Sequence, residues 1–144
     1  MKLGHTDEGG YTMDYQKLME KTNQGNHFMI HNHMKLTQMW EDHAIVELEV
    51  QPESHNLFGS IHGGVFLTMA DCAAGAAARS RGQSYVTLSN SFEFFRGTDH
   101  EHIRTLSSVR HRGKTICVVS VDVKDGADLL LASGTFTMFC TGSI

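Results

Sequence analysis

The residues best suited to chemistry lie close together, where a polar loop meets the one strongly predicted helix. They are Asn56, His62, Gly63, Gly64 and, inside the helix, Asp71. A helix N-terminus presents unpaired backbone N–H groups and a partial positive charge, and glycines let another molecule approach those groups closely. A carbonyl oxygen placed there is polarised, and an oxyanion forming on it is stabilised.

Asp71 is the only acid in an otherwise apolar helix. Burying an unpaired carboxylate is costly, so Asp71 indicates either a structural ion pair or a group that faces a cleft. Beside a polarised carbonyl, a carboxylate can activate water or attack directly. Together these residues predict an acyl-transfer hydrolase without a catalytic serine, cysteine or metal. Each polar loop residue also has a plain structural explanation: Asn56 can shape a turn, the glycines can form a tight turn, and His62 can cap the helix.

The spacing along the helix predicts a shared site. Asp71 lies eight residues beyond Gly63, which is about 12 Å along a helix axis. Reacting groups must approach to roughly 3 Å, so one carbonyl cannot contact both from the same chain. If both act, Asp71 comes from a neighbouring subunit. We therefore expect a homo-oligomer, a dimer or tetramer, whose active site is shared between two chains.

The elements that position these residues follow from hydrophobic periodicity. Residues 63–80 predict a helix that is apolar all round and therefore buried. Strands are expected at residues 34–40, 44–50, 85–95, 103–110, 115–123 and 129–139, after a short helix at 13–21. In the strand after the long helix, alternation places Val86, Leu88, Phe92 and Phe94 on one face. One antiparallel sheet can hide such a helix by curling around it, so the predicted fold class is α+β, a curled antiparallel sheet wrapped around one long central helix.

Length and composition exclude several classes of protein. The 144 residues fit one domain, which we place at 13–144 after a flexible tail at 1–12. A net charge of −4 gives no indication of the basic surface that binding to nucleic acid requires. No stretch approaches the roughly 18 apolar residues of a membrane span, and the N-terminus lacks the apolar run of a secretory signal. Three cysteines without CxxC spacing favour a reducing compartment, the cytoplasm.

The pattern Asn56-x(5)-His62-Gly63-Gly64 with Asp71 downstream resembles the motif of hotdog-fold thioesterases of the phenylacetic-acid-degradation (PaaI-like) type. The resemblance runs from about residue 44 to residue 139, and the first forty residues match the family least. It implies hydrolysis of acyl-CoA thioesters by homodimers, often paired into tetramers. Coenzyme A is then part of the substrate, and no metal or other cofactor is implied.

The resemblance also implies roles for single residues. Asp71 matches the catalytic acid, as general base or nucleophile, and Gly63 matches the backbone N–H donor to the thioester carbonyl. Asn56 and His62 match polar groups beside that carbonyl and the leaving thiolate. Thr87 falls where relatives often carry a Ser or Thr that helps to hold water, although it can also be an ordinary strand threonine.

Contacts to the rest of the substrate are predicted from the residue types. Gly64 permits a close approach to the helix N-terminus. Arg110 and Arg112 suit the phosphates of coenzyme A, or else form a solvated basic edge. Phe58 and Phe66 can line an aromatic acyl pocket, or else belong to the core.

Ten histidines suggest metal binding, but the sequence does not support it. His31 and His33 are two residues apart, as are His100 and His102, yet no third ligand follows at a recognisable spacing. We therefore expect surface histidines and no metal site. Cys72 lies mid-helix among apolar residues, where an inert buried thiol is usual.

Two other functions use the same residues. A hotdog hydratase or dehydratase would use His62 and Asp71 as an acid–base pair. A module that binds acyl-CoA or acyl-carrier protein without turnover would need neither as a catalyst.

Overall fold

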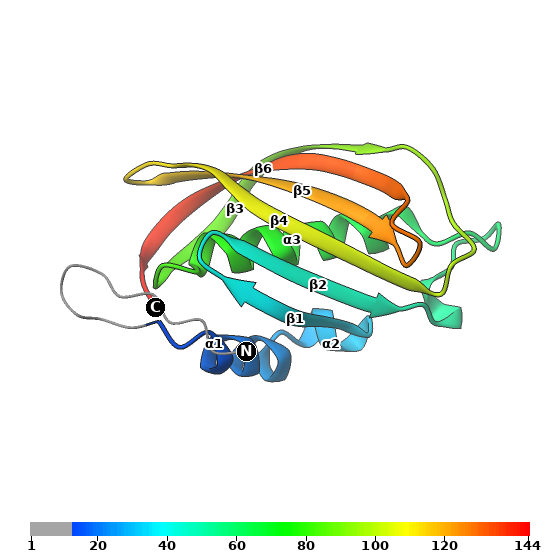
Figure 1. The fold of residues 1–144 in the computed structure, drawn as a ribbon, viewed down its shortest axis with the longest axis horizontal. Coiled ribbons are helices and arrows are strands. Elements are labelled where there is room, and N and C mark those ends of the chain that lie inside the picture. Colours follow the sequence, from blue (N-terminus) through cyan, green and yellow to red (C-terminus); the bar gives the residue numbers. More distant parts are fainter. Residues whose placement is uncertain (1–12) are drawn as a thin grey trace.

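The computed structural model describes residues 13–144, so the expected tail at 1–12 lies outside the described residues. A six-stranded antiparallel sheet and one long helix, α3 (Gly63–Arg79), dominate the chain (Figure 1). The sheet order is β1-β2-β4-β5-β6-β3. The strands are β1 (Met34–Trp40), β2 (His43–Glu49), β3 (Gln83–Phe94), β4 (His102–Arg112), β5 (Ile116–Asp125) and β6 (Leu130–Ser143).

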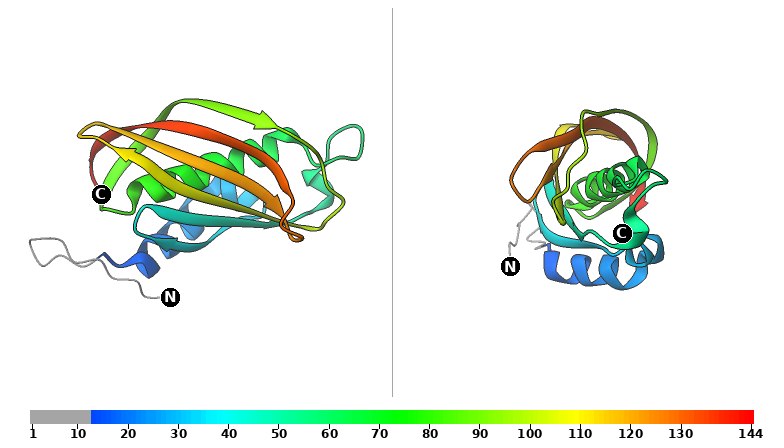
Figure 2. Two further views of the ribbon diagram at one scale, coloured as in Figure 1. Left: turned by 45° about the horizontal axis from the view of Figure 1, so that its top comes forward. Right: turned by 90° about the vertical axis from the view of Figure 1, so that its right-hand side faces the viewer.

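The sheet curls around α3, as the view along the helix in Figure 2 shows. The inward face of α3 contributes Met69 and Ala73 to the core, and Val119 and Phe136 reach it from β5 and β6, all fully buried. The hydroxyl of Ser107 lies 2.7 Å from the carbonyl oxygen of Ala73, which ties the helix to β4. The expected α+β hotdog architecture is confirmed.

One face of α3 is open, contrary to the expectation of a helix buried all round. Gly64 and Asp71 are exposed, and Leu67, Thr68 and Cys72 between and beside them are half-buried. These positions repeat at helical spacing and form one stripe, which we call the open stripe. It exists because a six-stranded sheet that curls around a helix keeps two edges, β1 and β3, and leaves a gap between them.

The faces of β3 differ from the predicted alternation. The pairing register with β6 shifts between Thr87 and Ser89, which marks a β-bulge. Because the bulge inserts one residue, Thr87 faces α3 before it, and Phe92 and Phe94 face α3 after it. Val86 and Leu88 are instead exposed, so their predicted common face with Phe92 and Phe94 is wrong.

Two N-terminal helices pack beside β1: α1 (Tyr15–Gly25) and α2 (His27–His31). Asn26 separates them; its backbone N–H bonds to Thr22 at the end of α1, and its side chain accepts from Met29 at the start of α2. The sequence predicted α1 only in part and missed α2, because five residues are too few to show a helical period. The predicted hairpin of β1 and β2 is confirmed.

The connection from β2 to α3 contains the short 3₁₀ helix η1 (Pro52–Ser54). Across residues 13–144, none of the helices is both long enough and apolar enough to cross a bilayer.

Candidate active site

Asp71 and Thr87 form the best-defined polar pair on the open stripe. The Thr87 hydroxyl donates to Asp71 Oδ1 across 2.7 Å. The two residues come from α3 and β3, and the bulge of β3 aims Thr87 at the helix. Both are exposed in the single chain, so Asp71 is not the buried acid that the apolar helix suggested.

A pocket of about 350 Å³ lies beside Asp71. Its walls come from the α1–α2 junction, from α3, and from β3 and β6. The lining residues are Asn26, Phe28, Leu67, Thr68, Asp71, Cys72, Asn90 and Phe136. The sequence did not single out Asn26, Phe28 or Asn90, because the segments that carry them meet only when the sheet curls.

Cys72 also lines this pocket. Burial, with a smaller effect from the Asp71 charge, raises the pKa of its thiol to about 11. The thiolate is the reactive form, so a raised pKa disfavours Cys72 as a nucleophile, in agreement with the inert thiol expected from the sequence.

The N-terminus of α3 holds the second group of predicted residues. His62 is the N-cap, and the Gly64 N–H donates to its Nδ1 across 2.8 Å. A neutral imidazole that accepts at Nδ1 carries its proton on Nε2, so the ring offers a donor at Nε2. Among residues 13–144, nothing accepts a hydrogen bond from the Gly63 N–H, which leaves it available to a carbonyl oxygen.

Gly63 is also closely covered. A Cβ added there would lie 3.2 Å from the ring of Phe94. A side chain at this position would displace Phe94 from the helix N-terminus. The Gly64 N–H, by contrast, already donates to His62 Nδ1 and is not available to a ligand. Gly64 can contribute only by lacking a side chain that would obstruct a bound substrate.

Asn56 shapes the loop before the helix. Its Oδ1 accepts from the backbone N–H groups of Phe58 and Ser60 at 2.9 and 3.1 Å. The side-chain oxygen of Asn56 therefore shapes the turn, which is the structural explanation considered from the sequence. Its amide NH₂ has no acceptor within the described part of the chain.

The two groups of predicted residues are separate within one chain. Asp71 contacts Thr87 and Gly63 contacts Phe94, and Thr87 and Phe94 are roughly 20 Å apart along an extended strand. One thioester carbonyl cannot reach both.

A family comparison matches residues 58–132, a little over half of the chain, to the model described as "Thioesterase superfamily". The chain belongs to this thioesterase superfamily. The matched region contains both Gly63 and Asp71 and ends in β6. It excludes α1, α2 and the junction between them, the region that supplies Asn26 and Phe28 to the pocket.

Individual relatives agree with this assignment. A Streptococcus mutans protein solved with bound acetyl CoA is 32% identical, with a TM-score of 0.72 over 76% of this chain and 90% of that chain. A hypothetical thioesterase of Streptococcus pneumoniae, solved with coenzyme A, is 29% identical, with a TM-score of 0.77 over 84% and 98%. The acyl-coenzyme A thioesterase PaaI of Escherichia coli is 29% identical over 89 residues, 61% of this chain and 64% of that protein. This chain is therefore a thioester hydrolase with a PaaI-like hotdog fold.

Two of the predicted substrate contacts of this thioesterase need correction. Phe66 is only 3% exposed and packs in the core, and it is not among the residues that line the pocket at Asp71. Arg112 bonds to Asp42, to Tyr85, and to the carbonyl oxygens of Ala77 and Ala78. Its guanidinium ties the C-terminus of α3 to the sheet and is not free for a phosphate. Arg110 and Phe58 are exposed and remain candidates.

The histidine pairs do not form a metal cluster in the described part of the thioesterase. His33 pairs with Glu53 at 2.8 Å. His102 lies between Glu47 and Glu49, at 2.9 and 2.5 Å. Both histidines therefore have carboxylate partners.

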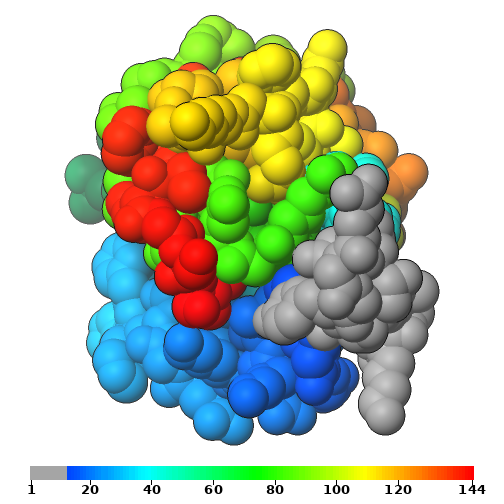
Figure 3. All heavy atoms as spheres, turned by 90° about the vertical axis from the view of Figure 1, so that its left-hand side faces the viewer, coloured from blue at the N-terminus to red at the C-terminus, as the bar shows by residue number. Residues whose placement is uncertain are grey.

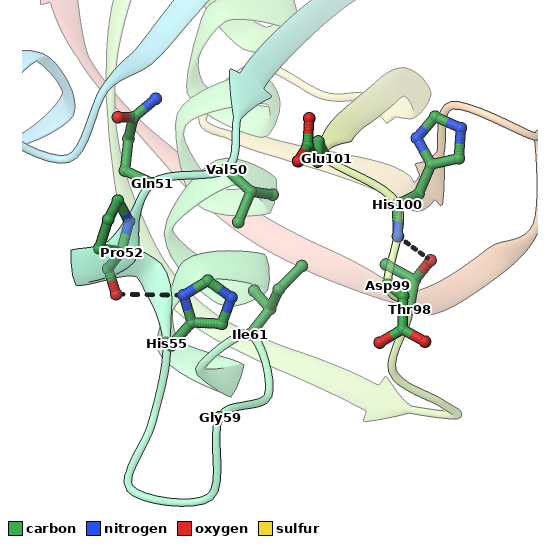
Figure 4. A pocket seen from close by; sticks show the side chains of 10 residues that line it. All are labelled: Val50, Gln51, Pro52, His55, Gly59, Ile61, Thr98, Asp99, His100 and Glu101. Carbon is green, nitrogen blue, oxygen red and sulfur yellow. Dashed lines mark hydrogen bonds between the residues drawn. The ribbon is translucent and has the colours of Figure 1, made fainter.

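A second pocket, of about 560 Å³, lies away from the Asp71 pair, between the loop after β2 and the segment before β4 (Figure 4). His55 Nδ1 approaches the carbonyl oxygen of Pro52, and the His100 N–H donates to Thr98. Asp99 and Glu101 place two acidic side chains in its lining. Their negative charge would repel the phosphates of coenzyme A and any other anionic ligand. We assign this pocket no part in the thioesterase reaction.

Proposed function

We propose that this thioester hydrolase acts on acyl-CoA, in an active site shared between two copies of the chain. The observation that carries the proposal is the Asp71–Thr87 pair beside a pocket on the open stripe, with the free Gly63 N–H two turns away on the same helix. The relatives solved with acetyl CoA and with coenzyme A support the choice of thioester.

The geometry of α3 supports the shared site. Two copies of α3 running antiparallel about a two-fold axis near Leu67 would bring the Gly63 N–H of one chain beside Asp71 of the other. Such an interface is self-complementary, and the open stripe is centred on Leu67 and Thr68. The twelve-residue strand β3 is also an unpaired sheet edge, with Val86 and Leu88 exposed beside it. Exposed strand edges of this kind readily pair with another chain.

The proposed reaction needs few groups. A water molecule transfers a proton to Asp71 and attacks the thioester carbonyl carbon. The Gly63 N–H of the other chain donates a hydrogen bond to the oxyanion that forms. The C–S bond then breaks, coenzyme A leaves as the thiolate, and the acid is released. In the alternative, Asp71 attacks and forms an anhydride, which water hydrolyses after the thiolate leaves. A thiolate is a good leaving group at neutral pH, so no strong general acid is required.

The remaining predicted residues take supporting roles. His62 Nε2–H and the Asn56 amide donate near the carbonyl or the leaving sulfur, and Thr87 orients Asp71 and its water. Phe58, at 85% exposed, reaches the substrate only across the subunit interface, and Arg110 meets the coenzyme A phosphates. We place the protein in the cytoplasm, as a dimer or tetramer that needs no metal or further cofactor.

Replacing Asp71 tests the mechanism. D71A abolishes thiol release from a panel of acyl-CoAs while the circular dichroism spectrum stays unchanged, and D99A, an exposed aspartate outside the site, keeps full activity. Turnover retained by D71A refutes the mechanism. An absorbance change of enoyl-CoA favours the hydratase alternative, and binding without thiol release favours the binding-module alternative.

A further inference from the structure

Arg79, in the last turn of α3, is a half-buried cation that the charge of Asp71 attracts without direct contact. It makes no hydrogen bond or ion pair with any residue from 13 to 144. The neighbouring Arg81 and Arg112 both pair with Asp42, at 2.7 and 2.9 Å. Removing a charge from water without a direct hydrogen-bonded partner is costly. The guanidinium of Arg79 is therefore suited to bind an anion that does not belong to residues 13–144.

Arg79 does not serve the helix end, which is the ordinary role of a basic residue in a last turn. Arg112 already donates to the carbonyl oxygens of Ala77 and Ala78 there. Arg79 instead folds back along α3, and its Nη1 lies 3.0 Å from where a Cβ on Gly75 would stand. The glycine thus makes room for a guanidinium one turn closer to Asp71.

The guanidinium lines a cavity of about 450 Å³ between α1 and the C-terminal end of α3. Figure 3 looks onto this end of the molecule, where the red C-terminal end of β6 lies beside the blue α1. The lining contains two cationic side chains and no acidic side chain: Leu18, Lys21, Thr22, Gly25, Asn26, Arg79, Ser84 and Ile144. Asn26 also lines the pocket at Asp71, so the two cavities adjoin along the open side of α3.

We propose that Arg79 binds a carboxylate at the far end of the acyl chain, so that the preferred substrates are thioesters of dicarboxylic acids. This inference rests on the proposed function, because it takes the thioester carbonyl to be at Asp71. From Asp71 to Gly75 the helix rises about 6 Å, which a short acyl chain of a few methylene groups spans. Guanidinium and carboxylate match in a bidentate pair, and Lys21 adds a second positive charge at the rim of the cavity.

The coenzyme A phosphates are a poorer match for Arg79. The pantetheine arm holds them much farther from the reacting sulfur than the distance from Asp71 to Arg79. An acyl terminus fits that distance, and it also explains why the site adjoins the pocket of the catalytic acid.

Two acyl-CoAs of equal carbon number, adipyl-CoA and hexanoyl-CoA, test the inference. The wild type has a higher kcat/KM for adipyl-CoA, by roughly 10- to 100-fold, as expected for a hydrogen bond between charged groups. R79M removes this preference, R79K keeps part of it, and G75A lowers it because the added methyl displaces the guanidinium. K114M, which removes an exposed cation that does not line the cavity, leaves the preference intact. Free adipate should also raise the melting temperature of the wild type more than hexanoate does, and R79M should abolish the difference.

The outcomes separate this inference from the proposed function. If no acyl-CoA is hydrolysed, the proposed function fails. If hexanoyl-CoA is hydrolysed at least as well as adipyl-CoA, the dicarboxylate inference alone fails. It is also overturned if R79M raises KM equally for both substrates, which would assign Arg79 to the phosphates. A change in sedimentation velocity of R79M would assign it to a subunit contact instead.

Discussion

The Thr87 hydroxyl donates to Asp71 Oδ1 across 2.7 Å, joining β3 to the exposed face of α3. The carboxylate is thereby held at the rim of a pocket whose other walls combine polar and apolar side chains. Without a β-bulge, a strand in this place would direct Thr87 and Phe94 to opposite faces. With it, both contact α3, at two points that belong to different halves of the proposed site.

Thr87 is a positioning residue, and its removal should affect kcat more than KM. T87V keeps the shape of the side chain but loses the donor, so kcat falls roughly 10- to 100-fold while KM changes little. T87S restores the hydroxyl and most of the rate. Steady-state kinetics of the three proteins measure this, and equal kcat values for T87V and wild type would remove Thr87 from the mechanism.

The shared site predicts complementation between two inactive variants. D71A lacks the carboxylate, and G63V lacks a usable N–H donor because its side chain collides with Phe94. In a mixed dimer, Gly63 of the D71A chain and Asp71 of the G63V chain form one intact site. Random exchange of equal amounts therefore recovers about a quarter of the wild-type activity, as two-fold symmetry requires. A mixture that stays inactive, although native mass spectrometry shows mixed dimers, would mean that each chain carries its own site.

Arg112 supports the fold and not the substrate. R112M removes one of the two arginines that pair with Asp42, and with it the side-chain donor to two carbonyl oxygens at the end of α3. We expect it to lower the free energy of unfolding by about 2–4 kcal/mol. Urea denaturation measures this loss. R110M is the matched control: it should leave stability unchanged and raise the KM for acyl-CoA. A higher KM in R112M at unchanged stability would restore the role first predicted from sequence.

His102 predicts a pH-dependent contribution to stability. Burial lowers the pKa of His102, but hydrogen bonds with Glu49 and Glu47 outweigh it, so the pKa is raised above its usual value. A group with a raised folded pKa binds its proton more tightly in the native state. Its stabilising effect is therefore complete below the unfolded pKa of about 6.5 and is lost as pH rises through the higher folded value. H102Q should be less stable than wild type at pH 6, and the difference should shrink at pH 9. A difference independent of pH would contradict this.

Much of the fold was predictable because its signals are local. Residues Met34–Glu49 show the alternation and polar turn of a hairpin, and the long apolar helix was predicted with its N-terminus at Gly63. The five-residue α2 and the bulge in β3 were not predictable, since neither leaves a period in the sequence. Arg112 was misassigned because only the fold shows that Asp42, seventy residues earlier, is its partner.

The sequence by itself determined the central helix, the identity of the acid and glycine on it, and the spacing that separates them, because residue spacing and helical rise depend on the chain alone. Only the tertiary structure decided which face of α3 stays open, that Thr87 meets Asp71, and that Asn26 and Phe28 wall the pocket. These contacts join segments distant in sequence, and they arise from the way the sheet curls and ends in two edges. The tertiary structure likewise decided that the guanidinium of Arg79 lines a cavity and forms no hydrogen bond or ion pair with any other residue from 13 to 144.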